Sequence, residues 1–456
     1  MRIAGIIAEY NPFHNGHAWQ IEQLRQRGFD AVVCVCSPGV VQRGTPAMLP
    51  TSVRTAAALA GGADLILSLP APYAVLSSEG FAAAGVALLT ALGCVDTLCF
   101  GVETGRTEDF IRLADVLEGR DFPPLLREKL DAGMPLPAAR AAAAGQLCPG
   151  ADAMLRQGNA LLGVDYCRAI LRQKSSLVPL ALPRMGAVHD APLEAAGATT
   201  ALQKKYASAS ALRALAGREG AAALAPYVPA ACLAVYRQAE AEGAWLDDAA
   251  FGAAALSRLR MLSARDLRVV RGAAEGLEHR LAAAVHSAGT WDALIDTMKT
   301  KRYATARLRR FALDAVLGYS AAPDHTAALG HTTAPSHTAS PGHTTSPGHI
   351  VSQGHTPAPG CTDTPAGPAG TAAGALPALP PYLHVLGANE AGRAVLRAAK
   401  ETARLPLSHS LAQLAKTGAP AAAVAATHAA AEDFTALCLR RPAPMGTAYT
   451  AKARFV

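Results

Sequence analysis

Short apolar runs alternate with longer amphipathic stretches from residue 1 to about residue 190 of the chain. Short runs bounded by polar residues are typical of buried strands, and the longer stretches have the periodicity of helices. We expect strands at residues 3–8, 30–36, 64–69 and 96–100. We expect helices at residues 17–27, 52–60 and 77–92. This alternation predicts an α/β fold with a Rossmann-like parallel sheet, whose ligands bind beyond the carboxyl ends of the strands.

After about residue 205 the pattern becomes almost wholly helical, so we expect a mainly helical domain to follow the α/β domain. The expected helices lie at residues 207–216, 230–242, 248–261, 264–273, 277–287, 291–299 and 305–317. Between residues 321 and 380 a histidine recurs every sixth position for much of the segment, among Thr, Pro, Ser and Gly. This composition has too little apolar content for a core. We interpret the segment as a disordered insert, with a metal-binding histidine tract as the alternative.

Globular composition returns at residue 381, and the pattern predicts a C-terminal helical region. Its expected helices lie at residues 389–403, 407–414 and 421–439. The predicted division of the chain is therefore into residues 1–205, 206–320, 321–380 and 381–456.

Composition and charge narrow the class of protein. The 456-residue chain is 51% hydrophobic and 17% charged, which suits a large globular protein. A formal charge of +7 is compatible with an anionic partner. No segment reaches the roughly 18 uncharged apolar residues of a membrane span. The nine cysteines include no C-x-x-C pair, which favours a reducing compartment. We therefore expect a cytoplasmic protein that does not enter a membrane.

Two histidines follow the first predicted strand in the segment AEYNPFHNGH, as His14 and His17 with Gly16 between them. Glycine permits close backbone approach where a strand turns into a helix. The helix that follows offers free N–H groups and a positive dipole end to an anion. Two imidazoles at that point can donate hydrogen bonds to a phosphate during in-line displacement. A turn with two surface histidines is the simpler alternative, and the position after the first strand argues against it.

A second motif lies in YASASALR, where Ser208 and Ser210 supply hydroxyls and Arg213 supplies a planar cation. The H-x-G-H segment resembles the first motif of the nucleotidyltransferase superfamily with a HIGH-type motif. YASASALR resembles that superfamily's second motif, which closes over the phosphates of ATP. The resemblance implies a nucleotidyltransferase domain in the α/β part of the chain.

A longer series of segments narrows the resemblance. The chain contains, in order, EYNPFHNGH, VVQRGTPA, ADLILSLP, YAVLSSEGFA, FGVETG, GNALLGVDY and RMGAVHD, followed by AEGLEHR, KTKRYATARLRR and VLGANEAGR. Together they are similar to the bacterial tRNA(Met) cytidine acetate ligase family over nearly the whole chain except the insert. The resemblance implies a ligase that forms acetyl-adenylate from acetate and ATP. It then transfers the acetyl group to N4 of the wobble cytidine of elongator tRNA(Met), giving N4-acetylcytidine.

The resemblance also implies which residues bind ATP. His14 and His17 would be catalytic, in contact with the phosphates. The implied ATP-binding residues are Ile7, Ala8, Glu9, Tyr10, Asn11, Pro12, Phe13, His14, Asn15, Gly16, His17, Ala18, Trp19, Gln20, Gly101, Asn159, Arg184, Ser208, Ser210 and Arg213. Mg²⁺ would arrive with the phosphates, and we expect no dedicated metal site in the protein.

The chain departs from the family pattern at three places. SPGVVQRG replaces the usual S-G-N-F-V-Q-R-G and lacks its Asn. Ala56 follows Arg54 and Thr55 where the family usually carries Lys, and Ala160 follows Asn159 where it usually shows a second Asn. Arg43 of V-Q-R-G would lie near the phosphates or the base, with a solvated loop arginine as the alternative. These departures bear on rate or acetate contacts more than on the fold.

The segment KTKRYATARLRR is the predicted contact with tRNA. Cations with an interleaved aromatic suit phosphate contact and base stacking. Alone, such a run is usually a solvated helix face. The predicted tRNA-binding residues are Lys299, Lys301, Arg302, Arg307 and Arg310, and Tyr303 lies between these cations in the sequence.

Two other functions compete with the acetate ligase. A small-molecule adenylyltransferase would share the motifs, but such chains are usually much shorter and lack a basic helical half. A non-catalytic RNA-binding protein with a degenerate nucleotide domain would explain the missing Asn and Lys. The retained His14, Gly16, His17 and Arg213 argue against it. The sequence leaves the oligomeric state open.

Overall fold

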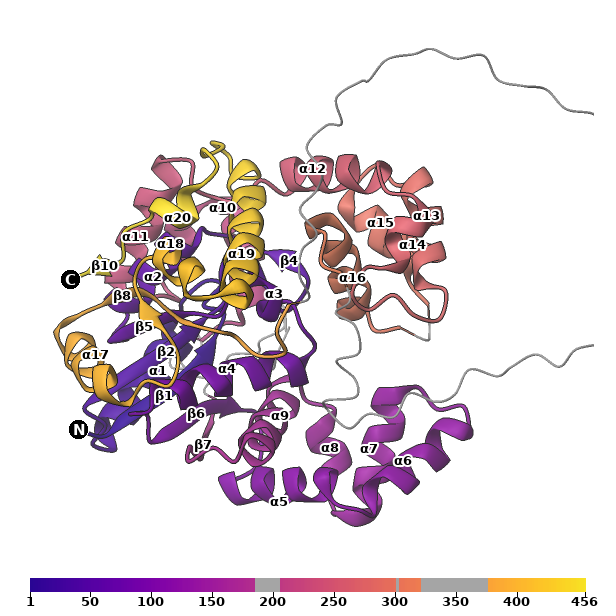
Figure 1. The fold of residues 1–456 in the computed structure, drawn as a ribbon, viewed down its shortest axis with the longest axis horizontal. Coiled ribbons are helices and arrows are strands. Elements are labelled where there is room, and N and C mark those ends of the chain that lie inside the picture. Colours follow the sequence, from indigo (N-terminus) through magenta and orange to yellow (C-terminus); the bar gives the residue numbers. More distant parts are fainter. Residues whose placement is uncertain (185–205, 301–302, 321–375) are drawn as a thin grey trace, which may run out of the picture.

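The computed structural model describes residues 1–184, 206–300, 303–320 and 376–456. A mostly parallel sheet carries helices on both faces, and a separate group of helices lies beside it (Figure 1). The predicted insert lies outside the described residues except for its last five positions. None of the helices in the described part of the chain is both long and apolar enough to cross a membrane.

The sheet has the strand order β10-β8-β5-β2-β1-β6-β7. Its parallel strands are β1 (Ile3–Ala8), β2 (Ala31–Cys36), β5 (Leu65–Ser68), β6 (Thr97–Val102) and β7 (Val178–Pro183). The first four coincide with the predicted strands to within two residues at each end, and the α/β fold is confirmed. A small hairpin, β3 (Val40–Val41) with β4 (Thr45–Pro46), follows β2.

Helices α1 (Asn15–Gln26), α2 (Thr51–Ala60) and α11 (Ala230–Ala241) cover one face of the sheet, against the Ala4 and Ile6 side chains of β1. Helices α4 (Ser78–Leu92), α5 (Thr107–Glu118) and α9 (Gly158–Gln173) cover the other, against Ile3 and Ile7. The remaining helices of the first half are α3 (Ala71–Ala74), α6 (Phe122–Asp131), α7 (Leu136–Leu147) and α8 (Ala151–Leu155).

The predicted helical domain divides into two parts. Helix α10 (Ala209–Glu219) and the 3-10 turn η2 (Ala221–Leu224) share the core of α1, α2 and α11, on the sheet. The group beside the sheet has a core of its own and consists of α12 (Asp248–Arg260), α13 (Ala264–Arg268), α14 (Leu277–Ser287), α15 (Trp291–Met298) and α16 (Thr305–Leu317) (Figure 1).

The C-terminal region returns to the sheet, although the sequence predicted helices alone. Strand β8 (Leu383–Ala388) pairs antiparallel with β5, while β9 (Leu407–Ser408) and β10 (Arg454–Phe455) pair parallel with β8. The helix expected at 407–414 is therefore β9 followed by α18 (Leu411–Leu414). The other helices are α17 (Glu390–Thr402), η3 (Ala415–Thr417), α19 (Ala419–Leu437) and α20 (Thr447–Thr450). Because β8 covers the edge of β5, the C-terminal region completes the first domain.

Two buried histidines in this region, His384 and His428, are expected to make its attachment to the sheet sensitive to acid. Burial lowers the pKa of His384 on β8 to about 3 and that of His428 on α19 to about 4. An unfolded chain protonates histidine near pH 6.5, so unfolding takes up protons below that pH and stability is lost as the pH falls toward 4. We expect a loss of about 1.4 kcal/mol per pH unit and per histidine.

A pair of variants checks this prediction by urea unfolding between pH 7 and pH 5. The double variant His384→Gln/His428→Asn keeps an acceptor for the Ala71 N–H that His428 binds, and its pH dependence is expected to be flatter. The matched control is His279→Gln, on an exposed histidine. Parallel loss of stability in the double variant and the wild type would contradict the assignment.

Candidate active site

A cavity of about 500 Å³ lies at the carboxyl ends of β1 and β6. This is the point at which the sheet's strand order changes direction, where parallel α/β sheets bind their ligands. Its walls come from the end of β1, the β3–β4 hairpin, the end of β6 and the starts of several helices. Helix α16, from the group beside the sheet, also contributes to the wall.

Four helices, α1, α4, α9 and α10, begin at this cavity. Their first residues or caps line it, namely His14 and Gly16 for α1, Ser77 and Ser78 for α4, Gly158 and Asn159 for α9, and Ser208 and Ala209 for α10. A helix N-terminus carries about half a positive charge, although at α9 the Glu103 carboxylate accepts from the Asn159 and Ala160 N–H groups and offsets that charge. Arginines also line the wall: Arg43, Arg184, Arg213 and Arg310. The cavity therefore favours a ligand that carries several negative charges.

His14 and His17 lie against each other with their ring centroids 3.8 Å apart. Each Nδ1 accepts a backbone hydrogen bond, from Gly16 N to His14 at 3.1 Å and from His14 N to His17 at 3.2 Å. A neutral imidazole that accepts at Nδ1 carries its proton on Nε2. The capping contacts of α1 therefore leave the Nε2–H group of each ring out of the cap, and both histidines line the cavity.

Both imidazoles are held neutral. Burial, with a smaller contribution from Arg184, lowers the pKa of His14 to about 3. The pKa of His17 is also lowered, by burial first and then by His14 and Arg184. At neutral pH both imidazoles are therefore uncharged, and the positive charge of the site comes from the arginines and helix termini.

Packing beneath the first motif fixes its shape. A Cβ on Gly61 would lie 2.2 Å from the Phe13 ring, so the start of the loop after α2 must be glycine for Phe13 to be buried there. Tyr236 of α11 donates its hydroxyl to the Phe13 carbonyl at 2.9 Å. Asn11 accepts at its side-chain oxygen from Met48 N at 2.9 Å. The turn between β1 and α1 is thus tied to elements on both sides.

The second motif meets the first. Ser208 caps α10 by accepting from Ala211 N at 3.2 Å, and its hydroxyl lies 3.0 Å from that of Ser210. Arg213 donates to the carbonyl of Asn11 at 2.8 Å, which ties α10 to the first turn. The structure therefore brings together the two segments that sequence similarity paired, and all three predicted residues line the cavity.

Gly101, Asn159 and Arg184 form the β6 side of the cavity. A Cβ on Gly101 would come within 3.3 Å of the Arg184 side chain, so glycine leaves room for the arginine. Glu103, which the sequence analysis missed, accepts from the Asn159 side-chain amide at 2.6 Å and from Ala160 N at 3.0 Å. Glu103 directly follows a buried strand in FGVETG, and this position in the sequence could have indicated that it lies at the site. Glu103 positions Asn159 by capping α9.

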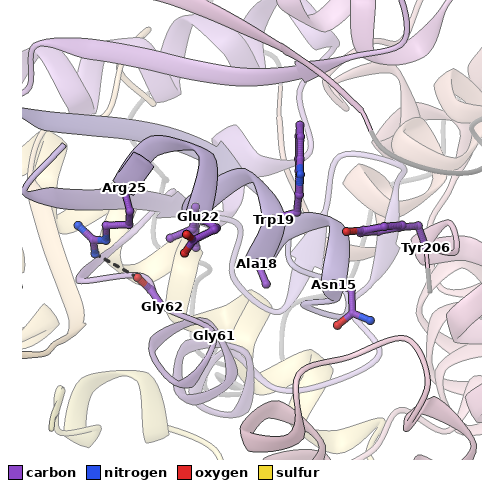
Figure 2. Close-up of a pocket in the computed structure, with 9 residues that line it drawn as sticks. Asn15, Ala18, Trp19, Glu22, Arg25, Gly61, Gly62 and Tyr206 are labelled. Atoms are coloured by element: carbon purple, nitrogen blue, oxygen red, sulfur yellow. Dashed lines mark hydrogen bonds between the residues drawn. The ribbon is translucent and has the colours of Figure 1, made fainter. Parts of the chain in front are cut away.

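Most of the predicted 7–20 segment lines the cavity, and the exceptions are Pro12, Phe13, Asn15 and Ala18. Asn15 and Ala18 line a second cavity of about 540 Å³ between α1 and the loop of Gly61 and Gly62. Figure 2 shows the Trp19 and Tyr206 side chains near one end of this second cavity and Arg25 near the other. Trp19 and Tyr206 line both cavities, which are therefore neighbours.

Of the predicted tRNA-binding residues that the structure describes, Arg310 differs from Lys299 and Arg307 in lining the main cavity. Lys299 is exposed and pairs with Asp296 at 2.6 Å. The Arg307 guanidinium lies over the Tyr303 ring, 4.9 Å from its centroid. Arg310 lines the main cavity beside the residues predicted to bind ATP. Lys301 and Arg302 lie outside the described residues.

In the loop SPGVVQRG, Gly39 stands where the family usually has Asn. A Cβ at Gly39 would lie 2.4 Å from the Thr435 hydroxyl and 3.1 Å from the Glu432 carboxylate. Glu432 of α19 accepts from Gly39 N at 2.5 Å and from the Thr51 hydroxyl at 2.9 Å. The C-terminal helix therefore occupies the space that a side chain at this position would need.

Within the described ranges, no three His, Cys, Asp or Glu side chains lie together as a protein metal site requires. Glu9 is the one carboxylate among the residues that line the main cavity in the described part of the chain, and it accepts from Gln42 N at 2.8 Å.

The parallel sheet, the H-x-G-H turn and the second motif define a HIGH-type nucleotidyltransferase, and a family model described as HIGH Nucleotidyl Transferase matches residues 1–334. The tRNA(Met) cytidine acetate ligase of Acetivibrio thermocellus is 32% identical over 334 residues, covering 70% of this chain and 78% of the relative. That of Bacillus velezensis is 34% identical over 318 residues, covering 68% and 74%. The chain belongs to the tRNA(Met) cytidine acetate ligase family.

A solved structure agrees with this fold. Thermotoga maritima TmcAL bound with alpha-thio ATP matches with a TM-score of 0.80 at 23% identity, covering 100% of this chain and 99% of that chain. The apo form of the same protein matches with a TM-score of 0.81.

Proposed function

We propose that the protein activates acetate with ATP and transfers the acetyl group to N4 of the wobble cytidine of elongator tRNA(Met). The observation that carries this proposal is the cavity itself. Helix N-termini, four arginines and the imidazoles of His14 and His17 line a space with room for a polyphosphate. Family membership supplies the substrates, and this geometry supplies the chemistry of their activation. We expect the reaction to take place in the cytoplasm.

In the first step an acetate oxygen attacks the α-phosphorus of ATP, and pyrophosphate leaves. The products are the mixed anhydride acetyl-adenylate and pyrophosphate. Charge on the phosphoryl oxygens is stabilised by preorganised donors in such in-line displacements. We assign that role to the Nε2–H groups of His14 and His17 and to Arg213. Mg²⁺ would enter on the phosphates of ATP, since Glu9 is the one carboxylate near them in the described part of the cavity.

In the second step the cytidine N4 amine attacks the acetyl carbon, loses a proton, and AMP leaves. The wobble base must be unstacked to reach the anhydride, which costs little in an anticodon loop. The protein's part is to keep acetyl-adenylate from water and to hold the base beside it.

Acetate-dependent exchange of labelled pyrophosphate into ATP, without RNA, tests the first step. We expect exchange with acetate and none when acetate is omitted. An exchange rate that does not depend on acetate but rises when a nucleotide acceptor is added would favour a small-molecule adenylyltransferase. Absence of nucleotide binding would favour the RNA-binding protein without activity.

The basic segment is expected to bind tRNA phosphates through Lys299, Lys301, Arg302 and Arg307. Each neutralised phosphate contact releases counterions, so its loss lowers the slope of log affinity against log salt by about 0.7–0.9. A quadruple Ala variant is therefore expected to bind tRNA(Met) more weakly and with a flatter salt dependence.

Filter binding at several salt concentrations measures both quantities. The matched control is Arg265→Ala/Arg268→Ala, which removes exposed cations from α13 in the same helical group. An unchanged slope in the quadruple variant would assign these residues to a solvated face, and the RNA contact would then lie elsewhere.

A further inference from the structure

Helix α16 belongs to the group beside the sheet, yet it reaches the cavity through Ala306 and Arg310. It makes this approach by packing on the β3–β4 hairpin that follows β2. The hairpin lies between the helical group and the end of β1. Arg310 is thus carried to the nucleotide side of the molecule.

The contact between hairpin and helix is made backbone to backbone. Gly44 has φ +78°, and a Cβ there would lie 2.4 Å from Arg310 N and 2.6 Å from the Arg309 carbonyl carbon. Both the positive φ and the close approach require glycine at this position. The fold therefore sets the distance between Arg310 and the hairpin within narrow limits.

The Arg310 guanidinium is held at the cavity by the same hairpin. Its Nη1 donates to the Gln42 carbonyl at 3.3 Å, and Gln42 N donates to Glu9 at the end of β1. The nearest acidic group on its helix, Asp314, is bound bidentately by Arg271 at 2.9 and 2.7 Å. No ion pair within the described residues includes Arg310. Burial lowers the pKa of Arg310, and the nearby Asp314 carboxylate offsets this effect only in part.

We propose that Arg310 binds an anionic group of a reactant inside the cavity, the carboxylate of acetate or a phosphate of ATP, and acts in adenylation rather than in holding tRNA. This inference rests on the proposed function. A planar guanidinium can bind either group through two parallel hydrogen bonds. The helical group then completes the adenylation site as well as offering a surface to RNA.

Steady-state exchange kinetics without RNA test the proposal with Arg310→Ala, Arg310→Lys and the control Arg268→Ala. Loss of a charge-assisted hydrogen bond predicts a fall of about 10- to 100-fold in kcat/KM for Arg310→Ala. Arg310→Lys, which keeps the charge without the planar fork, should recover part of it. A rise in the KM for acetate alone identifies the carboxylate, whereas weaker binding of alpha-thio ATP identifies a phosphate.

Gly44→Ala gives a second, independent perturbation. It forces α16 from the hairpin without removing a charge, so exchange should fall while tRNA affinity changes less. Urea unfolding of each variant separates loss of function from loss of fold.

If the wild type carries out exchange and folded Arg310→Ala matches it in every kinetic and binding constant, the inference fails and the proposed function stands. If Arg310→Ala weakens tRNA binding but leaves exchange unchanged, Arg310 binds tRNA and the inference is wrong. If the wild type neither catalyses pyrophosphate exchange nor binds nucleotide, the inference about Arg310 and the proposed function both fail.

Discussion

His17→Asn is expected to reduce acetate-dependent pyrophosphate exchange by about a hundredfold or more while leaving the protein folded. The Asn side-chain oxygen can take the place of Nδ1 and accept from His14 N, so the start of α1 keeps its cap. It offers no donor where Nε2–H stood. A loss of exchange activity in His17→Asn is then due to the missing donor to the phosphate and not to a damaged helix α1.

Two further variants make this test specific. His14→Asn keeps an acceptor for Gly16 N and is expected to show a similar loss. His17→Gln reaches toward the position of Nε2 with an amide N–H and should retain more activity than His17→Asn. Exchange within about threefold of wild type in folded His17→Asn would remove the histidine from the catalytic assignment.

Arg54→Met is expected to lower the free energy of unfolding by on the order of 3 kcal/mol. The buried Arg54 guanidinium donates to the carbonyls of Glu9 at 2.7 Å, Ser37 at 2.9 Å and Leu49 at 3.0 Å, and also to Pro38. Methionine fills the volume but leaves these buried carbonyls without donors. Arg54 thus joins the ends of β1 and β2, on which the cavity depends.

Urea unfolding at constant pH measures this effect. Arg268→Ala, an exposed arginine, serves as the control and should change stability by less than about 0.5 kcal/mol. Arg54→Lys keeps the charge but cannot reach four carbonyls, so it should fall between wild type and Arg54→Met. A stability of Arg54→Met equal to that of the control would show that water replaces the guanidinium at no cost.

The local parts of the site could be predicted from sequence because their chemistry is local. The turn from β1 into α1 depends on neighbouring residues, so the H-x-G-H segment alone indicated two imidazoles at a helix N-terminus. The second motif could be paired with it only through resemblance. The bond from Arg213 to Asn11 joins residues 202 positions apart, which no periodicity reveals.

The parts that escaped prediction depend on distant contacts. Strand β7 contains Pro179 and Pro183, and proline is tolerated there because β7 is the last strand of the sheet path. Strand β8 follows the insert and pairs with β5, more than 300 positions earlier. Arg310 looked like its basic neighbours in sequence. Its contact with Gln42, 268 positions away, places it at the cavity.

The central claim is tested most directly by incubating the purified protein with isotopically labelled acetate, ATP, Mg²⁺ and an elongator tRNA(Met) transcript, followed by nucleoside mass spectrometry. We expect labelled N4-acetylcytidine at the wobble position, dependent on both acetate and ATP and lost with His17→Asn. A transcript that remains unmodified, while the same protein carries out acetate-dependent exchange, would contradict the transfer to tRNA.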